Sequence, residues 1–366
     1  MIFRILNITI FLLFSFFLFD KTFAKGFYNW DAVAYTFAVN IDEGLSIEDA
    51  HAKTYQTLKQ EVNDGLFKDL CCSSKYRQAQ YADPENLSSM MPMYALKPGY
   101  IFLIKLTKNI FQVSEFKAMS YISSLSVLLI AGLIFLSFFS IPGFAQFIWI
   151  PIAFLGELLF LGKLMTPDAI SALVILLGII GLLKKRYIAG YTLLGLSLLF
   201  RLDLIVAIGL LGLLPILNRN YTFALVNSSI FLLAYFMISY SSDHVGWWPH
   251  FYTSLVSTQV NMSEFAPEFS LNKYLEILYG NFMWVLNDNR YIKWFATSFA
   301  LLLVSIAVYS EKKNTHLNII GIVLGLSIFI KFILFPKVDS RVYLSIFVAL
   351  IYIVGLNFKN TKKYID

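Results

Sequence analysis

Long apolar runs separated by short polar segments account for most of this chain. The first covers Ile5 to Phe19, and the others follow one another from Ser120 onward. A helix needs about 20 predominantly apolar residues to cross the hydrocarbon core of a bilayer. We therefore expect an all-α polytopic membrane protein with about ten transmembrane helices. These helices are expected over Ile5–Phe19, Ser120–Phe139, Phe144–Leu161, Thr166–Leu183, Tyr187–Phe200, Leu204–Leu217, Thr222–Tyr240, Trp294–Tyr309, Asn318–Phe335 and Val342–Leu356.

The loops between the runs set the topology. Tyr187–Leu217 contains Arg201 and Asp203, so it can form one long helix or two short helices that turn at these charges. Cytoplasmic loops of membrane proteins carry an excess of Lys and Arg. Two helices place every basic cluster in the cytoplasm together with both termini, whereas one long helix would put the last three clusters outside. We therefore expect two helices. The clusters are Lys184–Arg186, Arg219, Lys312–Lys313 and Lys359–Lys363.

This topology leaves two long extracytoplasmic loops in one transmembrane domain of residues 1–366. The first loop covers residues 20–118 and the second covers residues 241–293. In the first loop, apolar residues recur at helical spacing after Ser46, which predicts an amphipathic helix lying on the membrane surface. A second surface helix is expected over Lys97–Phe111, which is too short and too rich in lysine to span. The first apolar run can be a cleaved signal peptide, but we favour an uncleaved signal-anchor helix.

Composition agrees with a membrane location. Hydrophobic residues make up 58% of the chain and charged residues 14%, whereas soluble domains carry about 25% charged residues. The net charge of +6 is spread over many short loops, so it indicates membrane topology and not a nucleic-acid partner. We expect an integral, multi-pass protein, which in a bacterium would lie in the inner (plasma) membrane. Cys71 and Cys72 are adjacent, which favours two ordinary cysteines or a vicinal disulfide over a metal site.

Polar residues gather in the segments that this topology places outside. Ionisable groups at the edge of the hydrocarbon are costly unless they pair or line a wet cavity, so they are candidates for function. The cytoplasmic loops are short and carry little besides basic residues. We therefore expect any chemistry on the extracytoplasmic face. The outer segments are "NWDAVAY", "MYALKPGY", "KLMTPDA", "FRLD", "SSDHVGWWPHFY" and "FPKVDSRVYL".

Structural roles compete with functional ones in three of these segments. Asp31 can cap a surface helix, because Asp is a good N-cap residue. Asp168 opens a predicted span directly after a Thr-Pro pair, so we expect it to be a helix cap. Arg201 and Asp203 can pair with each other at the tip of a helical hairpin.

Two further outer segments have structural alternatives. Lys337, Asp339 and Arg341 can form a solvated turn. His244 and His250 flank "VGWWP", which can be an interfacial aromatic anchor. No two histidines have a metal-ligand spacing with nearby acids, and no phosphate-loop or dinucleotide motif has a supporting strand–helix context. We therefore expect neither a metal nor a cofactor.

Taken together, the outer residues fit the transfer of a sugar from a lipid-linked phosphate. Glycosidases usually need one carboxylate to activate the nucleophile and a second to protonate the leaving oxygen. A lipid phosphate leaves as a stable anion, so the second acid can be dispensed with. What remains is a general base, for which Asp31 is the candidate, and groups that hold the phosphate and the sugar. The candidate substrate ligands are Lys97, Arg201, His244, Trp247, His250, Lys337 and Arg341.

In this layout the chain resembles the glycosyltransferase-C superfamily, polytopic enzymes that use polyprenyl-phosphate sugars. Asp31 in "YNWDAVAY" follows the first span, "YALKPGYIFLIKL" precedes the second, and Arg341 in "DSRVYL" opens the last. The resemblance implies Asp31 as general base and Arg341 as a ligand of the donor phosphate, with Lys97 and Arg201 as further candidates. It implies transfer of a sugar, with inversion, to a hydroxyl of a glycan, lipid or protein acceptor.

The chain differs from many members of that superfamily in the spacing of its acidic residues. Many relatives carry a second acid beside the first, whereas the nearest acids here, Asp42 and Glu43, are too far along for a dyad on one helical turn. This departure puts metal dependence in doubt, and we expect none.

Other functions compete with this hypothesis. An O-antigen-type polymerase or ligase of lipid-linked glycans also uses outer loops with arginine and histidine, and the loop Ser241–Lys293 supplies the histidines. A lipid or glycan transporter would need charged or broken helices near the middle of the membrane, where Lys331 and Glu157 are the candidates. The sequence has no internal repeat that would support the transporter. A purely structural membrane protein is the remaining alternative.

Overall fold

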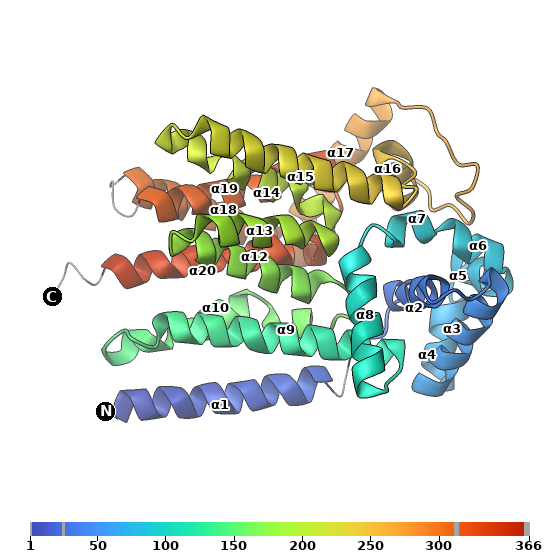
Figure 1. Ribbon diagram of the computed structural model, residues 1–366, viewed down its shortest axis with the longest axis horizontal. Helices are drawn as coiled ribbons and strands as arrows, with labels where there is room; N and C mark the ends of the chain where they lie inside the picture. Colours follow the sequence, from blue (N-terminus) through green and yellow to red (C-terminus); the bar gives the residue numbers. More distant parts are fainter. Residues whose placement is uncertain (1, 24–25, 311–314, 362–366) are drawn as a thin grey trace.

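Helices make up almost all of the structure (Figure 1). The computed structural model describes residues 2–23, 26–310 and 315–361, and within these ranges the only extended pairing is an isolated bridge between Phe27 and Leu164. The helices up to the middle of the chain are α1 (Ile2–Phe23), α2 (Trp30–Asp42), α3 (Ile47–Glu61), α4 (Asp64–Cys72), α5 (Lys75–Ala82), α6 (Pro84–Ser89), α7 (Met91–Tyr94), α8 (Pro98–Phe111), α9 (Glu115–Phe138), η1 (Gly143–Ile148), α10 (Trp149–Leu155), α11 (Leu158–Lys163) and α12 (Asp168–Leu183). The remaining helices are α13 (Tyr187–Leu196), η2 (Ser197–Leu199), η3 (Leu202–Leu204), α14 (Ile205–Gly212), η4 (Leu214–Asn218), α15 (Tyr221–Ser241), α16 (Trp247–Leu255), α17 (Leu271–Asn287), α18 (Asn289–Ser310), α19 (Thr315–Leu334), η5 (Ser340–Tyr343) and α20 (Leu344–Thr361).

Six helical segments in the described ranges are long and apolar enough to cross a membrane: α1, α9, α15, α18, α19 and the run from η5 into α20. They run in a common direction in Figure 1. Large apolar side chains remain exposed along α15, as expected of a surface that contacts lipid instead of water. The chain is therefore an all-α, multi-pass membrane protein. The exposed residues on α15 include Leu225, Leu232, Leu233, Phe236 and Met237.

Four shorter apolar stretches complete the bundle: Gly143–Leu155, Asp168–Leu183, Tyr187–Leu199 and Leu202–Asn218. The stretch Tyr187–Leu217 is interrupted at Arg201, whose backbone is extended between η2 and η3, so it forms two short helical pieces as the loop charges indicated. The single helix expected over Phe144–Leu161 is wrong in detail. Glu157 adopts a left-handed conformation with φ +51°, which ends α10 and separates it from α11.

The helices α2 to α8 pack together at one end of the bundle (right in Figure 1), while α1 begins and α20 ends at the other. The predicted helix after Ser46 is confirmed as α3, and the Ser46 side chain caps it by accepting from the Asp49 N–H at 3.1 Å. Its apolar face, including Tyr55 and Leu58, is buried in the core of this region. Protein therefore covers the face that we expected to meet the membrane surface. The helix α8 runs across the ends of the spans, where it packs on α9.

Two basic segments lie at the end of the bundle away from α2 to α8. Asp168 lies at the end that α2 to α8 cover, whereas Lys184–Arg186 follow the other end of α12, 16 residues on, or about 24 Å away. Arg219 follows η4 in the same way. Two of the predicted basic clusters, Lys312–Lys313 and the end of Lys359–Lys363, lie outside the described residues.

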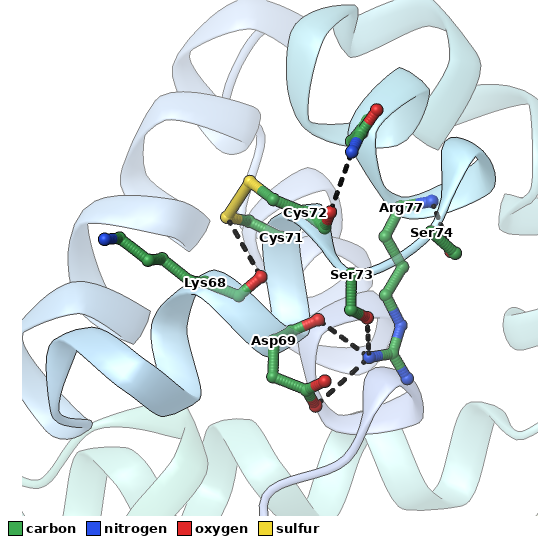
Figure 2. Close-up of a disulfide and its surroundings, with 8 residues drawn as sticks. Lys68, Asp69, Cys71, Cys72, Ser73, Ser74 and Arg77 are labelled. Atoms are coloured by element: carbon green, nitrogen blue, oxygen red, sulfur yellow. Dashed lines mark hydrogen bonds and ion pairs between the residues drawn. A yellow bond between two sulfur atoms is a disulfide. The ribbon is translucent and has the colours of Figure 1, made fainter.

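Cys71 and Cys72 form a disulfide at the end of α4 (Figure 2). Beside it, the Arg77 guanidinium donates to the Asp69 carbonyl at 2.8 Å and to the Ser73 hydroxyl at 2.9 Å. Of the two possibilities left by the sequence, the vicinal disulfide is therefore the one observed.

Candidate functional site

A cavity of about 730 Å³ lies between the α2–α8 region and the neighbouring ends of the bundle helices. It is lined from seven separate parts of the chain, and its wall contains the predicted base together with every predicted substrate ligand. The fold thus brings together residues that are up to 310 positions apart. These predicted residues are Asp31, Lys97, Arg201, His244, Trp247, His250, Lys337 and Arg341.

Asp31 faces the cavity from the first turn of α2. Asn29 is the N-cap of this helix and accepts from the Ala32 N–H at 2.9 Å, so Asp31 is not the cap. Its carboxylate accepts from the Tyr94 hydroxyl at 3.2 Å and pairs with the Arg341 guanidinium. Burial raises the pKa of Asp31, but the charge and hydrogen bond of Arg341, the charge of Lys97 and the hydrogen bond from Tyr94 together outweigh burial and leave the pKa below its usual value. Asp31 is therefore ionised at neutral pH.

Arg341 lies in η5, directly before α20. Asp339 caps η5 by accepting from the Arg341 N–H at 3.0 Å, and its carboxylate is 3.4 Å from the guanidinium Nε. Arg341 thus lies between two carboxylates, those of Asp31 and Asp339. The loop that includes Lys337 lines the cavity, so it is not the solvated turn offered as the structural alternative.

Two lysines of the cavity have no carboxylate within salt-bridge distance in the part of the chain that the structure describes. Lys97 donates to the Met93 carbonyl at 2.7 Å and lies 5.3 Å from the ring centre of Tyr94. Lys337 donates to the Ser254 carbonyl at 3.2 Å. Burial lowers the pKa of Lys97 to about 8 and also lowers the pKa of Lys337. Because neither lysine is paired with a carboxylate, both ammonium groups are available to an anion that enters the cavity.

A chain of ion pairs forms another part of the wall. Arg201 pairs with Asp168 and donates to Asp203 at 2.8 and 3.1 Å, and Lys331 is 2.7 Å from Asp203. The pairing of Arg201 with Asp203, offered as the structural alternative, is observed. Because carboxylates already occupy the Arg201 guanidinium on both sides, Arg201 is a weaker candidate for a substrate ligand than Lys97.

Asp168 is not the helix cap that its position predicted. It is the first residue of α12, its side chain makes no capping hydrogen bond, and it is 1% exposed. Its carboxylate instead accepts from the Thr166 hydroxyl and pairs with Arg201. Asp168 pairs with Arg201, which lies 33 positions later in the chain, and the sequence next to Asp168 does not indicate this partner.

The two outer-loop histidines lie against each other. His244 Nε2 is 3.1 Å from His250 Nδ1, and the His250 ring contacts Phe335 edge-on with 5.7 Å between ring centres. Burial lowers the pKa of His250 to about 3, with a further contribution from Lys97, and burial also lowers the pKa of His244. Both imidazoles are therefore neutral at neutral pH. Trp247 lines the cavity beside them.

Sequence reasoning did not single out several other residues of the cavity wall. Trp30, Tyr35, Tyr76 and Tyr94 give it an aromatic side, and only Tyr94 carries a hydroxyl that reaches Asp31. In the described part of the chain, no group of three His, Cys, Asp or Glu side chains is placed to hold a metal ion.

No family model, curated protein or solved structure matches this chain.

Proposed function

We propose that this protein is a membrane glycosyltransferase of the glycosyltransferase-C type, which moves a sugar from a polyprenyl-phosphate donor to an acceptor hydroxyl. The observation that carries this proposal is the combination of an ionised carboxylate, Asp31, with the unpaired ammonium groups of Lys97 and Lys337 in one cavity. A base needs to reach the acceptor hydroxyl, and cations need to hold the phosphate that leaves.

In the proposed reaction the acceptor oxygen attacks the anomeric carbon of the donor sugar. The bond from that carbon to the phosphate oxygen breaks, and its electron pair stays on the phosphate. The proton of the acceptor hydroxyl passes to Asp31. The products are the glycoside and a polyprenyl monophosphate, whose new negative charge is held by Lys97, Lys337 and Arg341. Attack from the face opposite the phosphate gives inversion at the sugar carbon.

The ion pair between Asp31 and Arg341 has a place in this reaction. A guanidinium binds phosphate as readily as carboxylate, so a donor phosphate competes with Asp31 for Arg341. When Arg341 turns to the phosphate, the Asp31 carboxylate loses its strongest partner and becomes free to accept a proton. Donor binding thus frees the Asp31 carboxylate from its ion pair with Arg341.

The lining of the cavity suits the other parts of the donor. Aromatic rings pack on the apolar faces of sugars, and Trp30, Tyr35 and Tyr76 provide such rings. Ile205, Val206 and other apolar residues line the part of the cavity nearest the bundle. We propose that the polyprenyl chain leaves the cavity along this part, toward the lipid.

The proposal includes ten spans and an extracytoplasmic cavity. The six long helices and the four shorter apolar stretches together give that number. Two observations support the sidedness. The basic residues Lys184–Arg186 and Arg219 are at the end away from the cavity, as expected of cytoplasmic loops. The Cys71–Cys72 disulfide is on the cavity side, and disulfides persist in compartments outside the cytoplasm. In a bacterium the cavity would face outward from the inner membrane.

A polymerase or ligase of lipid-linked glycans is the second candidate, because His244 and His250 line the same cavity. In that case Arg341 and His250 would be essential and Asp31 would not. The transporter has less support, since Lys331 is paired with Asp203 and Glu157 is not among the cavity residues.

Membrane lipids of cells with and without the protein would test the proposal. A polyprenyl-phosphate sugar that accumulates in cells lacking the protein should decrease when the protein is supplied, with the free polyprenyl monophosphate rising in step, as measured by mass spectrometry. An unchanged pool of every such lipid would contradict the proposal.

A further inference from the structure

The His244–His250 pair is the part of the cavity that the proposed reaction does not yet use. His250 lies half-buried on α16, and its Nδ1 is occupied by His244. In the described part of the chain its other ring nitrogen, Nε2, has no hydrogen-bond partner. An imidazole with one free nitrogen on a cavity wall can bind a ligand that enters the cavity.

The charges that face His250 come from three other elements. Lys97 precedes α8 and Lys337 precedes η5, and both disfavour a second positive charge on the imidazole. His244 also opposes that charge, and Asp203 of η3 favours it. An anion bound between the lysines cancels the effect that they have on His250, so it removes part of the cost of protonation.

We propose that His250 is a further ligand of the leaving phosphate and takes up a proton when the phosphate binds. The identity of this phosphate rests on the proposed function. The Nε2–H of the resulting imidazolium donates to a phosphate oxygen, and Nδ1 stays hydrogen-bonded to His244. The proton comes from solvent through His244, because this residue lines both the cavity and a second hollow on the surface beside α15, together with Phe236 and Asp243.

This arrangement balances charge at the end of the reaction. The monophosphate leaves with one negative charge more than the phosphodiester had, and the acceptor proton has gone to Asp31. The proton taken up by His250 therefore compensates the new charge on the phosphate. His250 is a catalytic residue in this account, because it contacts the group that departs.

Proton uptake can be measured by calorimetry on the full chain in nanodiscs. Binding of farnesyl monophosphate is followed at pH 7 in two buffers with different ionisation enthalpies, because the heat difference reports protons exchanged. Lys97, with a pKa of about 8, is roughly nine-tenths protonated at this pH and contributes little. Inorganic phosphate distinguishes a site for any phosphate from one that also needs the isoprenyl tail, and farnesol gives the baseline without phosphate.

We expect the wild type to take up protons when it binds the monophosphate, and to take up none with farnesol. His250→Gln should remove most of this uptake and weaken binding about tenfold, the scale of one charge-assisted hydrogen bond. The matched control His316→Gln, at a histidine outside the cavity, should change neither. Undiminished uptake in a folded His250→Gln protein would overturn the proposal.

Two further measurements keep the test decisive. If His250→Gln does not fold, the ¹⁵N resonances of His250 in the wild type report its protonation directly, and a neutral ring in the phosphate complex would overturn the proposal. Asp31→Asn should keep both binding and proton uptake. A loss of uptake in the His250 variant together with full glycosyl transfer by Asp31→Asn would therefore contradict the role of Asp31 while supporting that of His250.

Discussion

Asp31 and Arg341 form an ion pair across the cavity although 310 positions separate them in the sequence. The pair joins the first turn of α2 to the 3₁₀ turn that opens the last apolar helix. It keeps the Asp31 carboxylate ionised, which a general base requires, and it holds a guanidinium where a phosphate can take it over.

Replacing Asp31 by Asn should abolish transfer while leaving the fold in place, because Asn keeps the shape of the side chain but cannot accept the proton. Transfer from a polyprenyl-phosphate sugar by purified protein should fall at least ~100-fold, the usual scale for a general base. Asp42→Asn is the matched control on the same helix, at an exposed residue that pairs with Lys105. Full activity of the Asp31 variant would exclude the assigned role.

Replacing Arg341 should weaken the binding of the donor. Arg341→Ala should raise the KM for the donor, since one phosphate ligand is lost. Arg341→Lys should restore only part of the affinity, because an ammonium lacks the planar fork that bonds phosphate at two points. Steady-state kinetics with varied donor would measure both effects. Arg290→Ala, at an exposed arginine of α18, should leave the KM unchanged, and an equal effect of both alanine variants would argue against a specific ligand.

The apolar pattern was sufficient to predict most helices of the bundle but not their breaks. A run expected over Ser120–Phe139 became α9, Glu115–Phe138, because a span needs only length and hydrophobicity. Glu157, in contrast, interrupts a run that looks continuous, because a left-handed residue leaves no mark in hydropathy. The membrane-surface role expected for α3 failed for a similar reason: amphipathicity shows that a face is buried, but not whether protein or lipid covers it.

The sequence was sufficient to predict residues that line the cavity, but not which of them pair with one another. Every predicted site residue lines the cavity, because ionisable residues near the membrane are costly without such surroundings. Their partners depend on contacts between distant elements. Tyr94 donates to Asp31 across 63 positions, and Asp168 pairs with Arg201 across 33. The sequence around Asp168 contains a good capping pattern, so local reasoning could not have placed it in an ion pair.

Phosphate binding should weaken as the pH rises. Burial lowers the pKa of Lys97 to about 8, so its ammonium group is mostly charged at pH 7 and mostly neutral at pH 9. An anion binds the charged form, which means that affinity is present below about pH 8 and is lost above it. Binding of farnesyl monophosphate at pH 7 to 9 would measure this loss.

Lys97→Arg provides the decisive comparison, because arginine stays charged over this range. The variant should lose the decline centred near pH 8, whereas Lys105→Arg, at a lysine on the outside of α8, should retain it. A decline of the same size and midpoint in the Lys97 variant would assign the pH dependence to another group.

The disulfide should report the side of the membrane. In intact cells, Cys71 and Cys72 should react with a membrane-impermeant maleimide only after treatment with an impermeant reductant, because the bridge faces the outside in the proposed topology. In a chain without these two cysteines, Asn218→Cys, at the exposed last residue of η4 at the opposite end, should react only after the cells are made permeable. The reverse pattern would invert the topology and place the cavity in the cytoplasm.

Asp168 should matter for stability through its buried pair with Arg201. Asp168→Asn leaves the guanidinium with Asp203 as its remaining partner, and breaking a buried pair costs about 3 kcal/mol or more when one charge is left uncompensated. The free energy of unfolding in detergent micelles, followed by tryptophan fluorescence, should fall by about this amount. Asp64→Asn, at an exposed residue in the first turn of α4, should cost only a few tenths of a kcal/mol. Equal losses in the two variants would show that the Asp168–Arg201 pair does not stabilise the fold. In that case the role of Asp168 would be to present its negative charge to the cavity.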